Sequence, residues 1–448
     1  MEKRGRKVTH MKINWFSPLP PEKTDIGNFT ARILPDLIQR ADVIVWTEQE
    51  KWDYSIDKLC TVKNINDLNW ADLNEQDISI FNIGNNADYH SKIWHISTQA
   101  PGIIILHDYH LQHLFGGIFR SQEDSGKYFN AMQRYYGTEG QLAARKFLSG
   151  TMSTEQISEQ FPLTEYALEN ALGVIVHTNY AFDKIVQSNR WPIELIPLPY
   201  PSTHNQTEMS THLQSRLNTA QSQCELIVFG YLGLNRRLES ILEALAELRV
   251  THKYSLNIYG QLWNKKNIEH KIEKLNLRSQ VKIHGYVTEK KLDEALSKSH
   301  LALNLRHPTM GEASGSQLRI WNHALPSLVT RTGWYAELPE DAVRFVGIDH
   351  EIEDIKSALI EFKMYPERFI EMGKKGKQYL EQWHNPDVYA QSVVTFAQQI
   401  CSVPSPAVAF KLAERVADEI SNWQGDDNND FGYVKPASSI YELFKNTK

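Results

Sequence analysis

Two adjacent arginines stand where a short run of small residues leads into a helix. Arg236 and Arg237 follow the sequence Phe229-Gly-Tyr-Leu-Gly-Leu-Asn235, which indicates a strand and then a turn. Such a turn lets backbone amides approach a phosphate, and the N-terminus of the next helix adds positive potential. A guanidinium there can bind a diphosphate through two hydrogen bonds, whereas without an anion its charge is unfavourably placed. The pair therefore indicates a diphosphate site, with a solvated helix start as the structural alternative.

A second loop rich in glycine and serine lies between an apolar run and a helical segment. Its sequence is Leu301-Ala-Leu-Asn-Leu-Arg-His-Pro-Thr-Met-Gly-Glu-Ala-Ser-Gly-Ser-Gln-Leu-Arg-Ile320. Backbone N–H groups at the helix start again point towards an anion. Glu312 lies in this loop, and a phosphate repels a carboxylate unless that carboxylate accepts hydrogen bonds from neutral hydroxyls, such as those of a sugar. The alternative is that Glu312 only stabilises the start of the following helix.

His107 closes another apolar run, Gly102-Ile-Ile-Ile-Leu106, and Asp108 follows it. Parallel sheets bind ligands at the carboxyl ends of their strands, so His107 is a candidate catalytic residue. The alternative is that it is a hydrogen-bonded residue at the rim of the sheet. His110 and His113 continue a spacing of three, but side chains at this spacing drift around a helix and do not converge on a metal. No carboxylate triad accompanies these histidines and no Asp-x-Asp pair follows any apolar run, so we expect no metal. No other cofactor is expected either.

The elements that position these residues are short apolar runs alternating with longer segments of helical periodicity. The first set of runs lies at residues 12–17, 42–46, 78–84, 103–108, 173–177 and 193–197. The second set lies at residues 226–230, 255–260, 281–285, 301–305, 327–330 and 343–346. Nearly continuous hydrophobic runs are typical of parallel strands covered on both faces, and residues 238–248 show the three-and-four spacing of a helix. The alternation, which occurs twice, predicts two doubly wound α/β domains in series.

Two seams divide the chain. The stretch Tyr200-Pro-Ser-Thr-His-Asn-Gln-Thr-Glu-Met-Ser210 is polar and rich in turn formers, and Pro386 should end a helix that begins near Pro366. We predict an N-terminal Rossmann-like domain over residues 1–205 and a C-terminal Rossmann-like domain over residues 206–384. Residues 385–448 are predicted to form helices that pack back on the N-terminal domain.

Composition excludes several classes of protein. The 448 residues carry a net charge of −6 and are 41% hydrophobic, so no strongly basic surface is available for nucleic acid. Cys60, Cys224 and Cys401 are too few and too widely spaced for a disulfide framework. No apolar run approaches the roughly 18 to 20 residues of a membrane span. We expect a cytoplasmic protein, with peripheral association at the inner face of the plasma membrane left open.

Taken together, these motifs resemble the GT-B-fold retaining glycosyltransferases of family 4, over residues 11 to 400. In the second half the resemblance rests on Gly230–Leu238, Gly260, His284-Gly-Tyr286 and Gly311-Glu-Ala-Ser-Gly315. In the first half it rests on Phe16–Pro21, Asp25–Thr30, Pro101–Asp108 and Ile175–Asn179. Within the family, residues 304–312 are similar to bacterial exopolysaccharide transferases, including cyanobacterial glucosyltransferases of the heterocyst-envelope polysaccharide. The resemblance implies two Rossmann-like domains that face each other across a cleft, with the acceptor on residues 1–205 and the nucleotide sugar on residues 206–384.

The resemblance also implies roles for individual residues. Catalytic roles fall on His107, Glu312 and Arg237. Donor-binding roles fall on Gly27, Arg236, Arg237, Gly285, Tyr286, Val287, Glu312, Ser314, Gly315, Ser316 and Gln317. Within that set, the two arginines neutralise the leaving diphosphate, residues 285–287 hold the base, and Glu312 contacts the donor sugar.

The chain departs from the family pattern at two places. Alignment on Ala324-Leu-Pro326 puts Gly311 and Arg319 at the two positions of the family's Glu-x7-Glu motif, so that Glu312 is shifted by one residue. The second Glu, which is the family's ribose ligand, is therefore missing. Tyr231 replaces the arginine that follows the family's first strand glycine, which leaves more of the diphosphate to the arginine pair.

The function that the resemblance implies is transfer of a hexose, taken here as glucose, from a UDP-sugar to a saccharide or lipid-linked acceptor. The expected setting is exopolysaccharide synthesis, and the expected chemistry is metal-independent, front-face displacement with retention of configuration. Two alternatives stay open. A GT-B-fold UDP-sugar epimerase would need several carboxylates for proton transfer, whereas a catalytically silent, sugar-nucleotide-binding partner of a polysaccharide assembly machine would explain the missing Glu.

Overall fold

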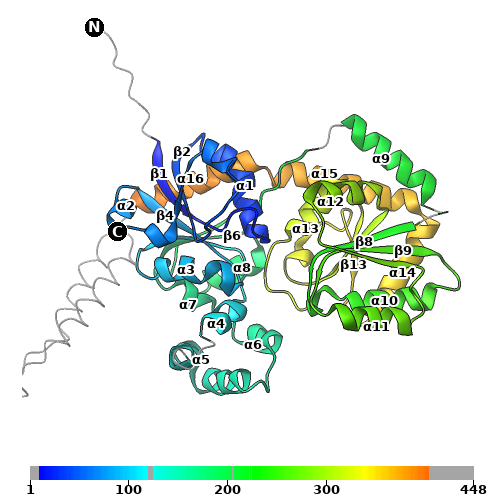
Figure 1. Cartoon of the computed structure of the whole chain (residues 1–448), viewed down its shortest axis with the longest axis horizontal. Coiled ribbons are helices and arrows are strands. Elements are labelled where there is room, and N and C mark those ends of the chain that lie inside the picture. The colour runs from blue at the N-terminus through cyan, green and yellow to red at the C-terminus, as the bar shows by residue number, and fades with distance from the viewer. Residues whose placement is uncertain (1–9, 120–124, 204–205, 221, 223, 403–448) are drawn as a thin grey trace, which may run out of the picture. The chain divides into compact units, whose positions relative to one another are not determined.

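The structure is a computed structural model of the 448-residue chain, and it describes residues 10–119, 125–203, 206–220, 222 and 224–402. The chain divides into two compact units. The first unit is formed by residues up to Ile196 together with residues from Asp387 onwards, and the second by Pro197–Pro386. Of the C-terminal helices predicted over residues 385–448, residues 403–448 lie outside the described residues. Each unit is described by itself below (Figure 1).

The first unit is built on a seven-stranded parallel sheet. Its strands are β1 (Met11–Phe16), β2 (Ala41–Thr47), β3 (Thr61–Asn64), β4 (Ile78–Ile83), β5 (Gly102–Leu106), β6 (Ala171–Val176) and β7 (Ile193–Leu195). The strand order is β3-β2-β1-β4-β5-β6-β7, and every pairing is parallel. The six apolar runs predicted as strands in this half are confirmed. Strand β3 was missed, because its sequence Thr-Val-Lys-Asn has no apolar run and occupies the exposed edge of the sheet.

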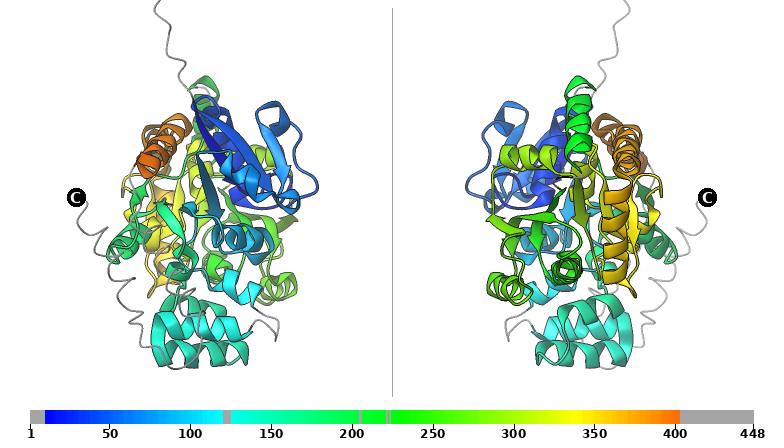
Figure 2. Two further views of the ribbon diagram at one scale, coloured as in Figure 1. Left: turned by 90° about the vertical axis from the view of Figure 1, so that its left-hand side faces the viewer. Right: turned by 90° about the vertical axis from the view of Figure 1, so that its right-hand side faces the viewer.

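Helices cover both faces of this sheet. They are α1 (Asp25–Leu37), α2 (Trp70–Asn74), α3 (Ala87–Ser97), α4 (Gln112–Ile118), α5 (Ser125–Leu148), α6 (Thr154–Gln160), α7 (Thr164–Leu168), α8 (Asn179–Val186) and α16 (Pro386–Ser402), with short 3₁₀ turns η1 (Ile56–Lys58) and η2 (Ile65–Asp67). Trp94 of α3 and Ile185 of α8 join a core with Phe16, Trp46 and Phe81 of the strands. In Figure 1 and in both views of Figure 2, α5 and α6 lie together at the margin of this unit, away from the sheet.

The opposite face of the first sheet is covered in part by the last described helix. Asp387 at the start of α16 pairs with Arg40 at 2.5 Å. The ring of Tyr389 packs edge-on against Phe29 of α1, with ring centroids 5.6 Å apart. Further along the helix, Phe396 lies so close to Gly173 of β6 that a Cβ on that glycine would be 2.9 Å from its ring. Chain segments from the two ends of the described sequence therefore form one core.

The second unit is built on a six-stranded parallel sheet in the order β10-β9-β8-β11-β12-β13. Its strands are β8 (Cys224–Leu232), β9 (Tyr254–Leu262), β10 (Val281–Gly285), β11 (Leu301–Asn304), β12 (Ser327–Thr330) and β13 (Arg344–Val346). All six correspond to predicted runs. In both sheets the order matches the doubly wound nucleotide-binding fold, whose strand order reverses beside the first strand. The predicted fold class, two Rossmann-like doubly wound domains, is thus confirmed.

Helices of the second unit also cover both faces of its sheet. They are α9 (Gln206–Thr219), α10 (Leu238–Leu248), α11 (Lys265–Lys274), α12 (Glu289–Lys298), α13 (Gly315–Asn322), α14 (Glu351–Met364) and α15 (Pro366–Trp383), with 3₁₀ turns η3 (Leu234–Arg236) and η4 (Gly333–Glu337). Helices α10, α11 and α14 share one core with the sheet, and α12 and α13 pack on its other face. As predicted, residues 238–248 form a helix, and the helix that begins at Pro366 ends before Pro386. Among the described helices, none is both long and apolar enough to cross a membrane.

Candidate active site

The two predicted phosphate loops of the second unit meet where its strand order reverses. Strand β8 runs into the loop with Arg236 and Arg237, strand β11 runs into the loop with Glu312, and these two strands are neighbours in the sheet. In open α/β sheets, ligands bind at the carboxyl ends of the strands at such a switch point. The fold therefore brings together two motifs that are separated by about 80 residues of sequence.

Glycines allow the backbone to come close at this edge of the sheet. Gly260 of β9 has a φ of +111°, and a Cβ on it would lie 2.0 Å from the carbonyl oxygen of Gly230 in β8. Only glycine fits that contact. Gly230 itself has a φ of +105°.

Arg236 lies beside the start of α13. A Cβ on Gly230 would be 3.9 Å both from Arg236 Nη2 and from Ser316 Oγ, so these two polar groups approach the same glycine. The same nitrogen donates to the carbonyl oxygen of Phe229 at 2.9 Å, and Arg236 is only 3% exposed. A buried guanidinium, a helix start and a bare glycine backbone form the kind of cradle that binds a phosphate.

Arg237 has a partner that the sequence did not indicate. It adopts a left-handed φ of 55° at the start of α10, and its guanidinium contacts the carboxylate of Glu351. Hydrogen bonding to Glu351 raises the pKa of Arg237 above its usual value. Glu351 is the first residue of α14, a position where an acidic residue stabilises almost any helix. For that reason nothing in the sequence distinguished Glu351 from an ordinary residue of a helix start.

Glu312 holds its own loop together. Its Oε2 accepts from the backbone N–H of Met310 at 2.8 Å, and its Oε1 lies 3.2 Å from Nε of Arg306. The helix that follows is capped by Ser314 instead, whose hydroxyl accepts from the backbone N–H of Gln317 at 3.1 Å. Ser314, and not Glu312, is therefore the capping residue of this helix. A carboxylate has further lone pairs, so Glu312 can still accept from a hydroxyl.

The first turn of α13 divides into residues that face inward and residues at the helix start. The side-chain amide of Gln317 is completely buried, where it accepts from Asn304 at 3.0 Å and donates to Ser327 at 2.8 Å. Its backbone N–H is already bonded to Ser314. Among the residues predicted to line the phosphates, Gly315 and Ser316 are thus the first-turn residues placed to donate to an anion.

Arg319, at the position of the family's second Glu, faces away from this cradle. It lies 2.6 Å from Glu289 and 2.8 Å from Asp293, both on α12, and its side chain is 9% exposed. His323 also contacts Asp293, at 3.1 Å. Arg319 is therefore a packing residue between α12 and α13, and it does not replace the missing acidic side chain.

The predicted base-binding segment follows β10. Gly285 has a φ of +69°, which turns the chain sharply at the end of the strand. Tyr286 is 61% exposed at this edge, and Val287 is half-buried. Beside them, the ring of His284 stacks on Tyr259 with centroids 4.2 Å apart and planes at 4°. A flat aromatic surface thus lies next to the turn.

In the first unit, His107 is buried at the end of β5. Its Nε2 lies 2.9 Å from Oδ1 of Asn82. Burial, together with the neighbouring His177 and His90, lowers the pKa of His107 well below its usual value. The ring is therefore neutral at physiological pH, and it can accept or relay a proton but does not supply a fixed positive charge.

Gly27 is connected to His107 through helix α1. It lies in the first turn of α1, where a Cβ would be 3.2 Å from the backbone of Leu19. Phe29 of the same helix packs edge-on against His107, with ring centroids 4.9 Å apart. The carboxylate of Asp108 accepts from the backbone N–H of Asn85 at 2.8 Å. The predicted site residues thus form two groups, one at the carboxyl edge of each sheet.

The histidines that follow His107 are used differently. His110 is bonded to the carbonyl oxygen of Ser158 at 2.5 Å and to the hydroxyl of Tyr180 at 2.9 Å. Over the described residues, no group of three or more His, Cys, Asp or Glu side chains could hold a metal ion.

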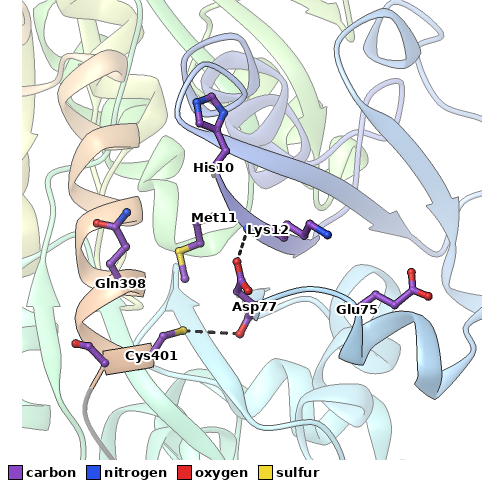
Figure 3. A pocket seen from close by; sticks show the side chains of 8 residues that line it. His10, Met11, Lys12, Glu75, Asp77, Gln398 and Cys401 are labelled. Carbon is purple, nitrogen blue, oxygen red and sulfur yellow. Dashed lines mark hydrogen bonds between the residues drawn. The ribbon is translucent and has the colours of Figure 1, made fainter. Parts of the chain in front are cut away.

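A separate cavity of about 580 Å³ lies at the opposite edge of the first sheet, beside the amino ends of β1 and β4 (Figure 3). It is lined by His10, Met11, Lys12, Glu75, Asp77, Gln398, Cys401 and Ser402. None of the predicted site residues lines it. The cavity is lined by polar, charged and apolar side chains. Two of the lining residues bond to each other, since Cys401 Sγ donates to the carbonyl oxygen of Asp77 at 3.7 Å.

Comparison with known protein families finds one match, which lies within the second unit. Residues 212–379, which are less than half of the chain, match the family described as glycosyl transferases group 1. A search of curated proteins found no match.

Solved structures match the fold over most of the chain. HepE of Anabaena in complex with UDP-glucose is 13% identical with a TM-score of 0.58, covering 88% of this chain and 100% of that chain. Sucrose-phosphate synthase of Thermosynechococcus elongatus is 14% identical with a TM-score of 0.58, covering 88% and 100%. WaaG, a glycosyltransferase involved in lipopolysaccharide biosynthesis, is 15% identical with a TM-score of 0.55, covering 85% and 99%. At these identities the likeness shows the GT-B fold.

Proposed function

We propose that this protein is a retaining glycosyltransferase that transfers a hexose from a UDP-sugar to a saccharide or lipid-linked acceptor. The observation that carries the proposal is the convergence of Arg236 Nη2 and Ser316 Oγ on Gly230 at the switch point of the second sheet. This cradle lies within residues 212–379, the segment that matches the group 1 glycosyltransferases. A nucleoside diphosphate supplies the anion that such a cradle binds.

The choice of donor draws on structural neighbours. HepE of Anabaena has been solved with UDP, with UDP and glucose, and with UDP-glucose. We therefore take UDP-glucose as the donor and exopolysaccharide synthesis, such as that of the heterocyst envelope, as the setting. The stacked pair Tyr259 and His284 beside Gly285 offers a flat surface for the uracil ring.

The reaction we propose is front-face displacement without a metal. Arg236 and Arg237 hold the diphosphate and stabilise the charge that develops on it as the glycosidic bond breaks. The leaving phosphate oxygen accepts the proton of the acceptor hydroxyl, and that hydroxyl oxygen bonds to the anomeric carbon on the same face. Glu312 accepts from a hydroxyl of the donor sugar. His107 presents a neutral ring nitrogen to a substrate hydroxyl, a role that fits its lowered pKa.

The first experiment is a thermal-shift screen of the full chain against UDP-, GDP- and ADP-sugars, because a ligand that binds the folded state raises Tm. We expect the largest shift with UDP-glucose. Transfer is then measured on oligosaccharide and lipid-linked acceptors, and the anomeric configuration of the product is read by NMR. An inverted product, or a larger shift with a GDP- or ADP-sugar, would contradict the corresponding part of the proposal. Activity that survives EDTA supports a metal-independent reaction, and a strict metal requirement would disprove it.

A catalytically silent sugar-nucleotide-binding protein is the second candidate, and one observation favours it. Arg319, where the family has its ribose-binding Glu, is fully engaged by Glu289 and Asp293. This candidate predicts a thermal shift with UDP-glucose but no transfer to any acceptor. An epimerase predicts a changed sugar when the donor is incubated alone, so a donor-only reaction analysed by NMR distinguishes the third reading.

The cellular location we propose is the cytoplasm, with the inner face of the plasma membrane as the site of lipid-linked acceptors. Cys60, Cys224 and Cys401 are all free thiols, which suits a reducing compartment. Fractionation of cells that express the chain, with and without high salt, tests both parts of this proposal.

A further inference from the structure

Arg237 and Glu351 join two helices of the second unit through a specific edge of the guanidinium. Arg237 Nε lies 2.9 Å from each carboxylate oxygen of Glu351, and Nη2 lies 2.8 Å from Oε2. Residues 237 and 351 are 114 positions apart in sequence. The carboxylate therefore occupies the edge of the guanidinium that is formed by Nε and Nη2.

The other edge of the same guanidinium is available. A guanidinium has five N–H donors in a rigid planar fork, so a carboxylate on the Nε edge leaves Nη1 and the second hydrogen of Nη2 for another acceptor. Among the described residues no hydrogen bond to Arg237 Nη1 is found, and the side chain is 35% exposed. An oxyanion can therefore bind Arg237 end-on without displacing Glu351.

Glu351 is itself held firmly. Its side chain is 5% exposed, and a carboxylate this deeply buried requires a charged or hydrogen-bonding partner. Its place as the first residue of α14 adds the favourable potential of the helix N-terminus. Helices α10 and α14 pack in one hydrophobic core, so the two partners are carried by a rigid support.

We propose that Glu351 is a positioning residue, which fixes the guanidinium of Arg237 so that its open edge is presented to the diphosphate of the donor. An arginine side chain loses considerable rotational freedom when it is ordered, and Glu351 removes that cost before the donor arrives. The inference rests on the proposed function, because it takes the donor diphosphate as the anion.

The test compares UDP with uridine, which shares the base and ribose but has no phosphate. For Glu351→Gln we expect the Kd of UDP, measured by titration calorimetry, to rise about tenfold or more. The Kd of uridine should stay within about twofold, which also shows that the variant is folded. Glu353→Gln is the matched control, since Glu353 is an exposed carboxylate in the same helical turn that pairs with Lys356, and the variant should bind UDP as the wild type does.

A double-mutant cycle separates positioning from a general structural role. In an Arg237→Ala background, Glu351→Gln should weaken UDP no further, because a residue that acts through Arg237 has nothing left to position. An additional loss of similar size in that background would overturn the proposal. Glu351→Asp keeps the charge but shortens the side chain, and it should weaken UDP while sparing uridine even where Glu351→Gln does not fold. Unchanged UDP affinity in the folded Glu351 variants would also overturn the proposal.

Pyrophosphate distinguishes the failure of this inference from that of the proposed function. If the wild-type chain binds pyrophosphate but not UDP, the proposal that the donor carries uridine is contradicted, whereas the inference about Glu351 is not. The Glu351 variants are then compared by their Kd for pyrophosphate. A wild-type chain that binds neither would overturn both proposals.

Discussion

Asn82 holds His107 in a single tautomer. The side-chain nitrogen of Asn82 donates to the carbonyl oxygen of Phe16 at 3.0 Å, which orients the amide so that Oδ1 faces His107 Nε2 at 2.9 Å. Because Oδ1 can only accept, Nε2 must carry the proton and Nδ1 must present its lone pair. His107 is therefore a hydrogen-bond acceptor at Nδ1.

Asn82→Asp should change the charge state of this histidine. A carboxylate facing Nε2 stabilises the imidazolium and so raises the pKa of His107, which burial otherwise keeps low. In ¹⁵N NMR spectra, we expect the wild-type ring to stay neutral between about pH 5 and 8 and the variant ring to titrate in that range. Transfer activity of the variant should then fall on the acid side of the new pKa. Asn14→Asp, at another buried asparagine of the same sheet, should leave the His107 signals unchanged.

Glu312→Gln should separate turnover from nucleotide binding. The change keeps the shape of the side chain but removes the charge that faces Arg306 and weakens the acceptor for a sugar hydroxyl. We expect kcat to fall about tenfold or more while the Kd of UDP stays within about threefold. Glu340→Gln, which changes an exposed partner of Arg331, is the control with unchanged kinetics. Equal kinetics in both variants would remove Glu312 from the site.

Replacement of both Arg236 and Arg237 by alanine should weaken the binding of UDP strongly. Hydrogen bonds to charged groups contribute about 1.5 to 3 kcal/mol each, so the double variant should lose several kcal/mol of binding free energy. The affinity for uridine should change little. Unaltered UDP affinity in calorimetry would exclude this pair from the phosphate site.

Gly260→Ala should destabilise the second unit. The added Cβ would lie 2.0 Å from the carbonyl oxygen of Gly230, and the φ of +111° is unfavourable for alanine. We expect a loss of at least about 2 kcal/mol in the free energy of unfolding, measured by denaturant titration. Gly126→Ala, where the new Cβ meets nothing within 4 Å, is the steric control and should not lower the free energy of unfolding, because alanine is the better helix former in α5. A stable Gly260→Ala variant would show that β8 and β9 can separate at this point without cost.

Acid should destabilise the second unit in part through His384. Burial lowers the pKa of this ring to about 4, against an ordinary 6.5, and Nδ1 donates to the carbonyl oxygen of Leu198 at 2.6 Å. The unfolded chain therefore binds a proton at higher pH than the folded chain, so the free energy of unfolding falls as the pH drops from 6.5 to 4. His384→Asn keeps a donor but cannot titrate, and it should make this fall shallower by up to about 1.4 kcal/mol per pH unit.

Hydrophobic patterning was sufficient to predict the framework of the fold. Parallel strands that are buried on both faces are apolar along their whole length. Runs such as Ile103–Leu106 and Leu226–Phe229 can therefore be recognised as strands from the sequence. An edge strand does not have to be apolar along its whole length, and for that reason the sequence did not indicate β3. Strand order was predictable only at the level of the fold class, because the reversal beside β1 and β8 depends on how crossovers close in space.

The site was predictable where it is built from local sequence. The turn after β8 and the loop before α13 carry small residues next to charged ones, and the fold brings both to one switch point. The role of Glu351 was not predictable, because it depends on a contact with Arg237 at the start of another helix, 114 positions away in sequence. The structural roles of Gln317 and Arg319 could not be predicted for the same reason. Each side chain binds partners on other elements, Gln317 on β12 and Arg319 on α12.

The return of α16 to the first unit has a consequence for synthesis of the chain on the ribosome. Arg40 of the first unit and Gln391 of α16 are hydrogen-bonded across 351 positions, so the contacts that complete this unit are of very long range. Translation produces all of the second unit, residues 197–386, before it supplies this helix. The second unit can therefore fold first as an uninterrupted segment. The surface of the first unit around Phe29 and Gly173 stays exposed until α16 has been translated and packs on it. The second unit is thus expected to complete its fold before the first unit, although most of the first unit is translated earlier.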